Sequence, residues 1–365
     1  MIEVKAFDYL EQYAEIEQEI ETAVKRVLKS GQLILGPEVQ AFEHEFAAWL
    51  GGGYGVGVNS GTDALVVALM TLGIGQGDQV ITVANTAVPT VSAICAVGAT
   101  PIFCEIDGDT CLMDIAELDA CITERTRAII PVHLYGNVVN VPKIRSVIAN
   151  RNIKIIEDCA QSHGAKLGSL PKPAMTGTMG DIGAFSFYPT KNLGAYGDAG
   201  LCYTSDEALA DKMRSTRMYG FKETQYSKMP GINSRLDELQ AAILRVKLPR
   251  LDVYIERRRA IAAQYSTILG STIKPVKPSS NAHHAYHQFV VKLTQRDTVK
   301  ERLTQLGVAT AIRYPWPIHT MSGFSDLNYK QGDLPVTESV ANEILSLPIY
   351  PELKSTQVEQ VCSTI

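Results

Sequence analysis

The chain has 365 residues, 45% of them hydrophobic and 20% charged, which is typical of a globular protein large enough for one large domain and a smaller one. Its 34 Lys and Arg residues are outnumbered by 39 Asp and Glu residues, so the formal net charge is −5. This balance argues against a nucleic acid or a membrane surface as the main partner, and any anionic substrate must therefore meet a local basic pocket.

The first half of the chain alternates helical and strand patterns. Residues 9–30 are predicted to form a helix that ends at Gly31, and the next helix carries an apolar stripe spaced by three and four residues: Val39, Phe42, Phe46 and Trp49. Further strands are predicted at Val56–Asn59, Gln79–Val83, Pro101–Glu105, Arg127–Leu134 and Ile153–Ile156, with helices at Ala64–Leu72 and Val141–Asn150. Strands that alternate with helices through residue 205 predict a mainly parallel sheet covered on both faces.

Two apolar runs in the middle of the chain lead to polar side chains. Ile153–Ile156 reads as a strand buried on both faces, and it is followed by carboxylates where such sheets present ligands. Ile182–Phe187 is the second run and leads to a lysine. Together the two runs supply an anion, an amide, a hydroxyl and an amine: Asp158, Gln161, Ser186 and Lys191. Pyridoxal phosphate needs such a set, because it binds a lysine amine, an anion at its pyridinium nitrogen, and donors around its phosphate.

A Ser-Gly-Thr turn opens the helix predicted at Ala64–Leu72. Gly61 and Thr62 lie at its N-terminus, where free backbone N–H groups and the helix dipole favour phosphate. Most turns of this kind are only helix caps, but the Asp158–Lys191 set makes phosphate binding the preferred interpretation here. The glycines at 55, 57 and 61 do not fit G-x-G-x-x-G, so a dinucleotide site is disfavoured.

The second half of the chain is predicted to contain a smaller α/β unit. Asn233 lies in a loop before a helix, and Leu251–Leu269 is predicted to be a basic helix whose run Arg257–Arg259 is interpreted as a solvated face. Strands at Tyr286–Leu293 and Ala309–Arg313, a helix at Val299–Leu306, the segment Ser346–Leu353 and a short final helix follow. The domain boundary is placed near residue 250, which gives domains of residues 1–250 and 251–365.

Two motifs resemble a known family. D-C-A-Q-S-H-G-A, beginning at Asp158, and S-F-Y-P-T-K-N-L-G-A-Y-G-D, beginning at Ser186, are similar in sequence and order to the DegT/DnrJ/EryC1/StrS family of nucleotide-sugar aminotransferases. The resemblance covers nearly the whole chain. It implies an α/β fold of fold-type I, with a large domain built on a mainly parallel mixed sheet flanked by helices and a smaller C-terminal α/β domain. It also implies pyridoxal 5′-phosphate as the cofactor.

The resemblance assigns roles to the polar residues. Lys191 would form a Schiff base with the cofactor and shuttle the substrate proton, while Asp158 would keep the pyridine nitrogen protonated. Gln161 would lie near the ring's 3-hydroxyl, and Ser186 would hold the phosphate together with Gly61 and Thr62. Asn233 matches an asparagine that reaches the phosphate from the neighbouring subunit, which implies a homodimer with shared active sites.

Two segments depart from the family pattern. Where the family commonly stacks an aromatic residue on the ring, the segment Thr86–Thr90 places Ala87, which lacks the extra worth of aromatic pairing, roughly 0.5–1.5 kcal/mol. The segment R-Y-P-W-P-I-H resembles H-Y-P-x-P-x-H with Arg313 in place of the first histidine. Tyr314 and His319 are candidates for substrate contact, and Arg313 for the sugar, the diphosphate or a core ion pair. His163 is a candidate for substrate contact or for a structural role.

The predicted activity is transfer of an amino group from L-glutamate to a 3-keto or 4-keto deoxy sugar linked to a nucleotide diphosphate. One alternative is a sugar dehydratase of the same family, in which histidine replaces the Schiff-base lysine. Another is a non-catalytic cofactor-binding or regulatory homologue. The carbon that is aminated and the identity of the nucleotide and sugar stay open.

The seven cysteines and the N-terminus bear on location. The cysteines are odd in number and show no C-x-x-C spacing, so we expect buried reduced thiols in a cytoplasmic protein and neither disulfides nor a metal site. The acidic N-terminus lacks the apolar region of a signal peptide, and no apolar stretch is long enough to span a bilayer.

Overall fold

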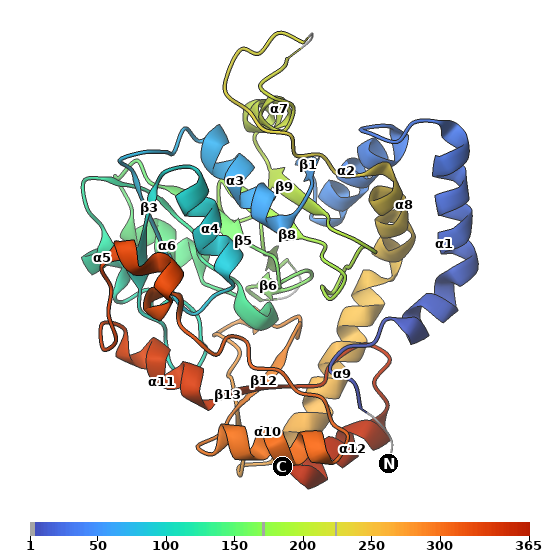
Figure 1. Cartoon of the computed structure of the whole chain (residues 1–365), viewed down its shortest axis with the longest axis vertical. Coiled ribbons are helices and arrows are strands. Elements are labelled where there is room, and N and C mark those ends of the chain that lie inside the picture. The colour runs from blue at the N-terminus through green and yellow to red at the C-terminus, as the bar shows by residue number, and fades with distance from the viewer. Residues whose placement is uncertain (1–3, 170–171, 223–224) are drawn as a thin grey trace.

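A mixed sheet of seven strands lies at the centre of the computed structural model, which describes residues 4–169, 172–222 and 225–365 (Figure 1). The strands are, in spatial order, β1 (Tyr54–Val58), β9 (Gly200–Thr204), β8 (Ile182–Ser186), β5 (Lys154–Asp158), β4 (Thr126–Ile129), β2 (Gln79–Val83) and β3 (Thr100–Cys104). β9 runs antiparallel to both of its neighbours, and the other pairs are parallel. The predicted mainly parallel sheet is confirmed.

Helices cover both faces of this sheet because its strands bury side chains on both. Ile156 of β5 packs with α3 (Gly61–Thr71), α4 (Val88–Ala96) and α7 (Glu207–Thr216). The preceding residue, Ile155, packs on the opposite face with α6 (Val141–Val147) and α5 (Leu118–Cys121). On that same opposite face Phe185 of β8 contacts α2 (Pro37–Trp49) and α8 (Glu238–Lys247). Successive strand residues point to opposite faces, which explains why the strands read as continuous apolar runs.

The first helix lies outside this layer. Figure 1 shows α1 (Leu10–Ser30) along the outer side of α8, where Ile16 and Ile20 pack against Ile243. The helix ends at Gly31, which takes a left-handed φ of 71° that glycine adopts without steric cost. The prediction of a helix over residues 9–30 is therefore confirmed to within one residue.

A second sheet lies in the C-terminal part of the chain, at the lower end of the molecule in Figure 1. Its antiparallel strands β10 (Lys274–Pro275), β12 (Phe289–Lys292) and β13 (Ile344–Leu347) are accompanied by α9 (Leu251–Leu269), α10 (Arg296–Gln305), α11 (Pro335–Glu343) and α12 (Ser355–Thr364). Val4 pairs with Val308 beside this sheet, so the N-terminal segment packs on the C-terminal part. The boundary at residue 250 stays a prediction.

Two local predictions are wrong, and two short strands appear that were not predicted from the sequence. Ala309–Arg313 forms no strand, because only Ala311 pairs, as a single bridge to Ser346. The segment Leu167–Gly180 carries two short strands, β6 (Lys166–Leu167) and β7 (Ala174–Met175), which join β11 (Ala282–His283) in a small sheet; residues 170–171 lie outside the described residues. Within the run Arg257–Arg259, Arg258 is buried rather than solvated, because successive helix residues point in directions about 100° apart.

Among the described residues, none of the helices combines the length and the apolar character needed to cross a bilayer.

Candidate active site

Asp158 is the last residue of β5. Its side chain is only 5% exposed, and hydrogen bonds fix it in place. Thr90 Oγ1 donates to its Oδ2 at 2.8 Å, and the backbone N–H of Ala160 donates to Oδ1 at 3.1 Å. A hydroxyl–hydroxyl bond of 2.9 Å joins Thr90 to Thr86. The carboxylate therefore sits at the carboxyl end of the sheet with its orientation fixed by two donors.

Gln161 is held on both sides of its amide. The backbone N–H of Tyr135 donates to Gln161 Oε1 at 2.8 Å, and Gln161 Nε2 donates to the hydroxyl of Tyr314 at 3.0 Å. Tyr135 takes a left-handed φ of 63°, which is strained for a bulky residue, and its hydroxyl donates to the backbone carbonyl of Arg313. These contacts bring together Gln161, Arg313 and Tyr314, three of the candidate site residues.

Gly61 and Ser186 approach each other as closely as their backbones permit. A Cβ atom built on Gly61 would lie 2.5 Å from the Cβ of Ser186 and 3.1 Å from its Oγ. Gly61 is the first residue of α3, whose N-cap Ser60 accepts from the Asp63 N–H at 3.1 Å. A helix N-terminus and a hydroxyl therefore share one cradle, which is the arrangement that binds a phosphate.

Replacing Gly61 by alanine tests this close approach. Because the added methyl group would collide with Ser186, we expect Gly61→Ala to lower the free energy of unfolding by about 1–3 kcal/mol and to weaken cofactor binding. Thermal unfolding and cofactor titration measure the two effects. Gly75→Ala is the matched control, because its Cβ would meet only the Val97 carbonyl at an ordinary 3.4 Å. Equal melting temperature and cofactor affinity for Gly61→Ala and the wild type would contradict the cradle.

Lys191 follows β8 in a loop that is held from three sides. Its N–H donates to the Tyr188 carbonyl at 2.8 Å, Asn192 Nδ2 donates to the Ala285 carbonyl at 3.1 Å, and Lys247 Nζ donates to the Gly194 carbonyl at 2.8 Å. Burial of the amine lowers the pKa of Lys191 to about 8; Asp158 opposes this shift and Arg313 adds to it. An amine with this pKa is partly unprotonated near neutral pH, as a nucleophile or a base requires.

A cavity of about 280 Å³ lies against Lys191. It is lined by residues of the Lys191 region and of the C-terminal part, and also by Ala6 and Phe7 of the N-terminal segment. Gln161, Arg313 and Tyr314 all line it. Burial raises the pKa of Tyr314 to about 12, so its phenol stays protonated and can donate a hydrogen bond.

Three groups of residues lie elsewhere. His163 is fully buried among Phe46, Phe185 and Phe187, and burial lowers its pKa to about 3. His319 is 2% exposed and its Nε2 lies 3.0 Å from Glu338 Oε1. Neither histidine lines the cavity at Lys191, so their substrate contacts stay predictions, and the surroundings of His163 suit the structural role. Ala87 is half-buried at the N-terminus of α4, and Asn233 is exposed.

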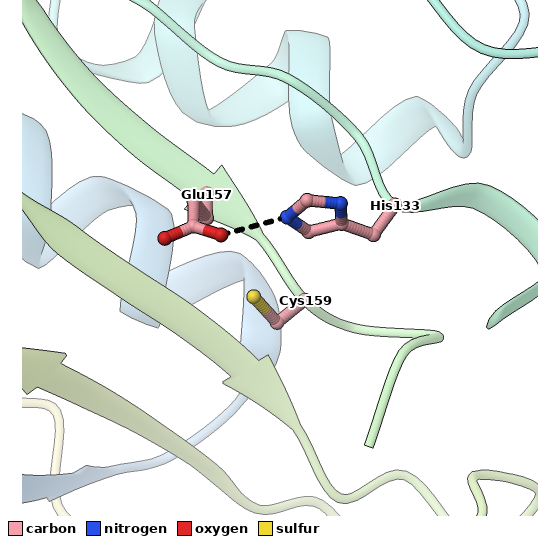
Figure 2. A group of neighbouring side chains, drawn as sticks. All are labelled: His133, Glu157 and Cys159. Atoms are coloured by element: carbon pink, nitrogen blue, oxygen red, sulfur yellow. Dashed lines mark hydrogen bonds and ion pairs between the residues drawn. The ribbon is translucent and has the colours of Figure 1, made fainter. Parts of the chain in front are cut away.

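Beside Asp158 lies a buried cluster of His133, Glu157 and Cys159, whose side chains point toward one another in Figure 2. His133 Nε2 lies 2.8 Å from Glu157 Oε2, and the Val139 N–H donates to His133 Nδ1 at 3.0 Å. Backbone N–H groups at Gly177 and Met179 donate to the two carboxylate oxygens at 2.9 and 2.7 Å. Hydrogen bonds already engage the ligand atoms of His133 and Glu157, so the cluster is explained as a network that fixes β5 and the loop after β7.

The sequence and the fold agree with known proteins over nearly the whole chain. The sequence profile of the DegT/DnrJ/EryC1/StrS aminotransferase family matches residues 14–365. The chain belongs to this family. It is 44% identical to the dTDP-3-amino-3,4,6-trideoxy-alpha-D-glucose transaminase of Micromonospora megalomicea, over 98% of this chain and 97% of the relative. The UDP-N-acetyl-3-dehydro-alpha-D-glucosamine 3-aminotransferase of Acidithiobacillus ferrooxidans is 42% identical, over 97% and 94%.

A solved structure extends this agreement to three dimensions. The S. venezuelae DesV structure, in complex with a ketimine intermediate, superposes with a TM-score of 0.96 at 39% identity and covers 100% of this chain and 98% of that one. The enzyme class predicted from the sequence, a sugar aminotransferase of the DegT/DnrJ/EryC1/StrS family, is confirmed. The predicted fold class is confirmed as well.

The residues present fit the pyridoxal phosphate that the family resemblance implies. Asp158 offers a fixed buried anion and Lys191 an amine with a lowered pKa, and the start of α3 lies directly against Ser186 because Gly61 carries no side chain. This donor set matches the nitrogen, aldehyde and phosphate of the cofactor.

Sequence reasoning missed several residues around the site. Thr90, which donates to Asp158, lies inside the quoted Thr86–Thr90 segment, and Tyr188, which lines the cavity, lies inside the quoted S-F-Y-P-T-K motif. Because both residues belong to motifs already quoted, the sequence alone could have identified them as candidate site residues. Arg258, His287 and Ser346 come from the C-terminal part, and nothing in their local sequence links them to Lys191.

Proposed function

We propose that this sugar aminotransferase uses pyridoxal 5′-phosphate to transfer the amino group of L-glutamate to a keto group of a nucleotide-diphosphate-linked deoxy sugar. The observation that carries the proposal is the buried amine of Lys191, with its lowered pKa, close to the fixed carboxylate of Asp158. The relatives named for dTDP-linked and UDP-linked amino sugars support a nucleotide sugar as the acceptor and leave the nucleotide open.

When bound, pyridoxal phosphate would supply an aldehyde and an electron-withdrawing ring that stabilises negative charge on a substrate carbon. Asp158 would hold the ring nitrogen protonated, and Gln161 would orient the ring from the side where it already binds Tyr314. Lys191 would hold the cofactor through its amine and, once released, carry a proton to and from the substrate carbon. Gly61, Thr62 and Ser186 would hold the phosphate.

Two alternatives from the sequence are less favoured. The family's sugar dehydratases carry histidine at the position of Lys191, and a purely regulatory protein would not require the complete set of Asp158, Ser186 and Lys191. Purified wild-type protein that is colourless, or whose absorbance does not change on addition of L-glutamate, would favour the regulatory alternative.

The direct test is a panel of 3-keto and 4-keto nucleotide sugars, with dTDP and UDP carriers, incubated with the purified enzyme and L-glutamate. We expect one sugar to gain an amino group, detected by mass, together with formation of 2-oxoglutarate. Loss of the sugar's hydroxyl without gain of nitrogen would identify the dehydratase and refute the proposal.

We further propose that the enzyme is a homodimer with shared active sites. Asn233 is exposed on the single chain and lies outside the cavity at Lys191, while its neighbour Ser234 is anchored to Asp63 at 2.7 Å. Tyr219 and Tyr226, which precede Asn233 by fewer than fifteen residues in the sequence, are 40% and 69% exposed. Exposed aromatic side chains next to an exposed amide suit a subunit interface across which Asn233 reaches the partner's phosphate.

Mixed dimers test whether the site is shared. Lys191→Ala and Asn233→Ala subunits should each be poorly active alone and should regain activity when combined, because one site of the mixed dimer then has both residues intact. The measurement is turnover after verified subunit exchange. A mixture that stays as inactive as its parents would show that Asn233 serves only its own chain.

We also propose a cytoplasmic location, because all seven cysteines are free thiols, as expected in a reducing compartment.

A further inference from the structure

The cavity at Lys191 is basic although the chain as a whole is acidic. Its lining includes two arginines, Arg258 and Arg313, and the amine of Lys191, together with the polar groups of Gln288 and Ser346. None of the described residues that line it is an aspartate or a glutamate, in a chain with a formal net charge of −5. A cavity with cations and no lining carboxylate attracts an anion.

Arg258 supplies a buried charge to this cavity. It is 2% exposed, and its Nη1 donates to the carbonyls of Tyr286 and Ile349 at 3.2 and 3.0 Å. Its Nε has no hydrogen-bond partner among the described residues. Glu352 offsets part of the charge but does not line the cavity. A buried cation with a spare donor is costly unless a further anion completes its environment.

Arg313 supplies an accessible charge. Its backbone is fixed because its carbonyl accepts from the Tyr135 hydroxyl, whereas its side chain is exposed. Among the described residues, no carboxylate lies within ion-pair distance of its guanidinium. A planar guanidinium on a fixed backbone binds a carboxylate through two parallel hydrogen bonds.

The size of the cavity limits what this anion is. At about 280 Å³ it lies just below the usual range of ligand pockets, roughly 300–1,000 Å³. Part of this volume is needed for the cofactor that binds Lys191, so the cavity suits the small carboxylate of an amino acid and is too small for a nucleoside diphosphate. The proposed reaction needs such an amino acid, and the amine it donates must come to Lys191, which lines the same cavity.

We propose that this cavity is the carboxylate subsite for the amino donor, with Arg313 as the principal contact and Arg258 as the buried charge behind it. The proposal rests on the proposed function, because only an aminotransferase needs a donor of this kind. Arg313 occupies the position of a family histidine. Under this proposal Arg313 selects the amino donor and does not bind the sugar or its diphosphate.

Binding of an unreactive dicarboxylate tests the subsite separately from turnover. Glutarate has the two carboxylates of glutamate and no amine, and its binding to the cofactor-loaded enzyme is measured by calorimetry. We expect Arg313→Gln to weaken glutarate binding about tenfold or more, because a hydrogen-bonded charge pair is lost. Arg257→Gln, which removes the same charge from the exposed side of the same helix as Arg258, should leave glutarate affinity unchanged.

Parallel titrations with dTDP and UDP separate the possible sources of the anion. Loss of glutarate affinity in Arg313→Gln with nucleoside-diphosphate affinity retained supports the donor subsite. Unchanged glutarate affinity overturns it, and so does an equal or greater loss of nucleoside-diphosphate affinity, which would assign Arg313 to the sugar substrate. Wild-type enzyme that binds glutarate but does not turn over glutamate would instead refute the proposed function, so the two failures are distinguishable.

Discussion

Lys191→Ala is expected to lower kcat at least about a thousandfold while the protein still folds and binds cofactor non-covalently. The loss follows from two roles, since the same amine attaches the cofactor and moves the substrate proton, and proton transfer by a positioned group is worth roughly 10²–10⁴-fold by itself. Steady-state turnover with L-glutamate and the keto sugar found in the panel measures this loss.

Borohydride reduction then locates the attachment. Peptide mapping of the reduced wild-type enzyme should find the pyridoxyl group on Lys191. Lys247 is the built-in control, because burial also lowers the pKa of Lys247 to about 8, but its Nζ donates to the Gly194 carbonyl and it lies outside the cavity. A label on Lys247, or on any lysine other than Lys191, would refute the assignment. Reactivity is thus expected to follow from position beside Asp158, not from the pKa alone.

Asp158→Asn is expected to fold normally and to lose activity about a hundredfold or more. The amide keeps the size of the side chain: its Oδ1 can still accept from the Ala160 N–H, and its Nδ2 can donate to the Thr90 hydroxyl. It carries no charge, however, to stabilise a protonated ring nitrogen. Thermal unfolding should therefore change little, while kcat falls.

The matched control for this substitution lies at the other end of the same two strands. Asp181 precedes β8, accepts from the Ile155 N–H at 2.8 Å and lies 3.2 Å from Arg145. Asp181→Asn should cost some stability and leave kcat near the wild-type value. Near-normal kcat for Asp158→Asn would remove Asp158 from the pyridinium role.

The sequence predicted those features of the fold and the site that are determined by neighbouring residues in the chain. The apolar runs of β5 and β8 predicted the position of Asp158 and Lys191, because burial on both faces leaves a continuous hydrophobic pattern. The turn at Gly61 was also predicted from a local pattern, because the start of a helix has characteristic capping residues. Glycine at that position is explained only by Ser186, which lies on a distant strand.

Features that depend on long-range packing were not predicted. A run of three arginines does not reveal that Arg258 points inward, since that depends on which face of α9 meets β13 and the cavity. The contact between His319 of the R-Y-P-W-P-I-H motif and Glu338 was not predicted either, because it depends on α11, a helix that was not predicted from the sequence. The segment Ala309–Arg313 is a further example: it has the sequence pattern of a strand, but only Ala311 pairs, in a single bridge, with a neighbouring strand.

The pairing of Val4 with Val308 has a consequence for biosynthesis. The Val4 N–H donates to the Gly307 carbonyl and the Ala309 N–H donates to the Val4 carbonyl, so the N-terminal segment has no docking partner until the ribosome has released residues 307–309. Contacts between residues this far apart in sequence form late in folding, because closing the long intervening loop costs conformational entropy. Since Ala6 and Phe7 line the cavity at Lys191, that side of the cavity is completed only after residue 309 has left the ribosome, and a nascent chain with its central sheet already folded would still have an open site.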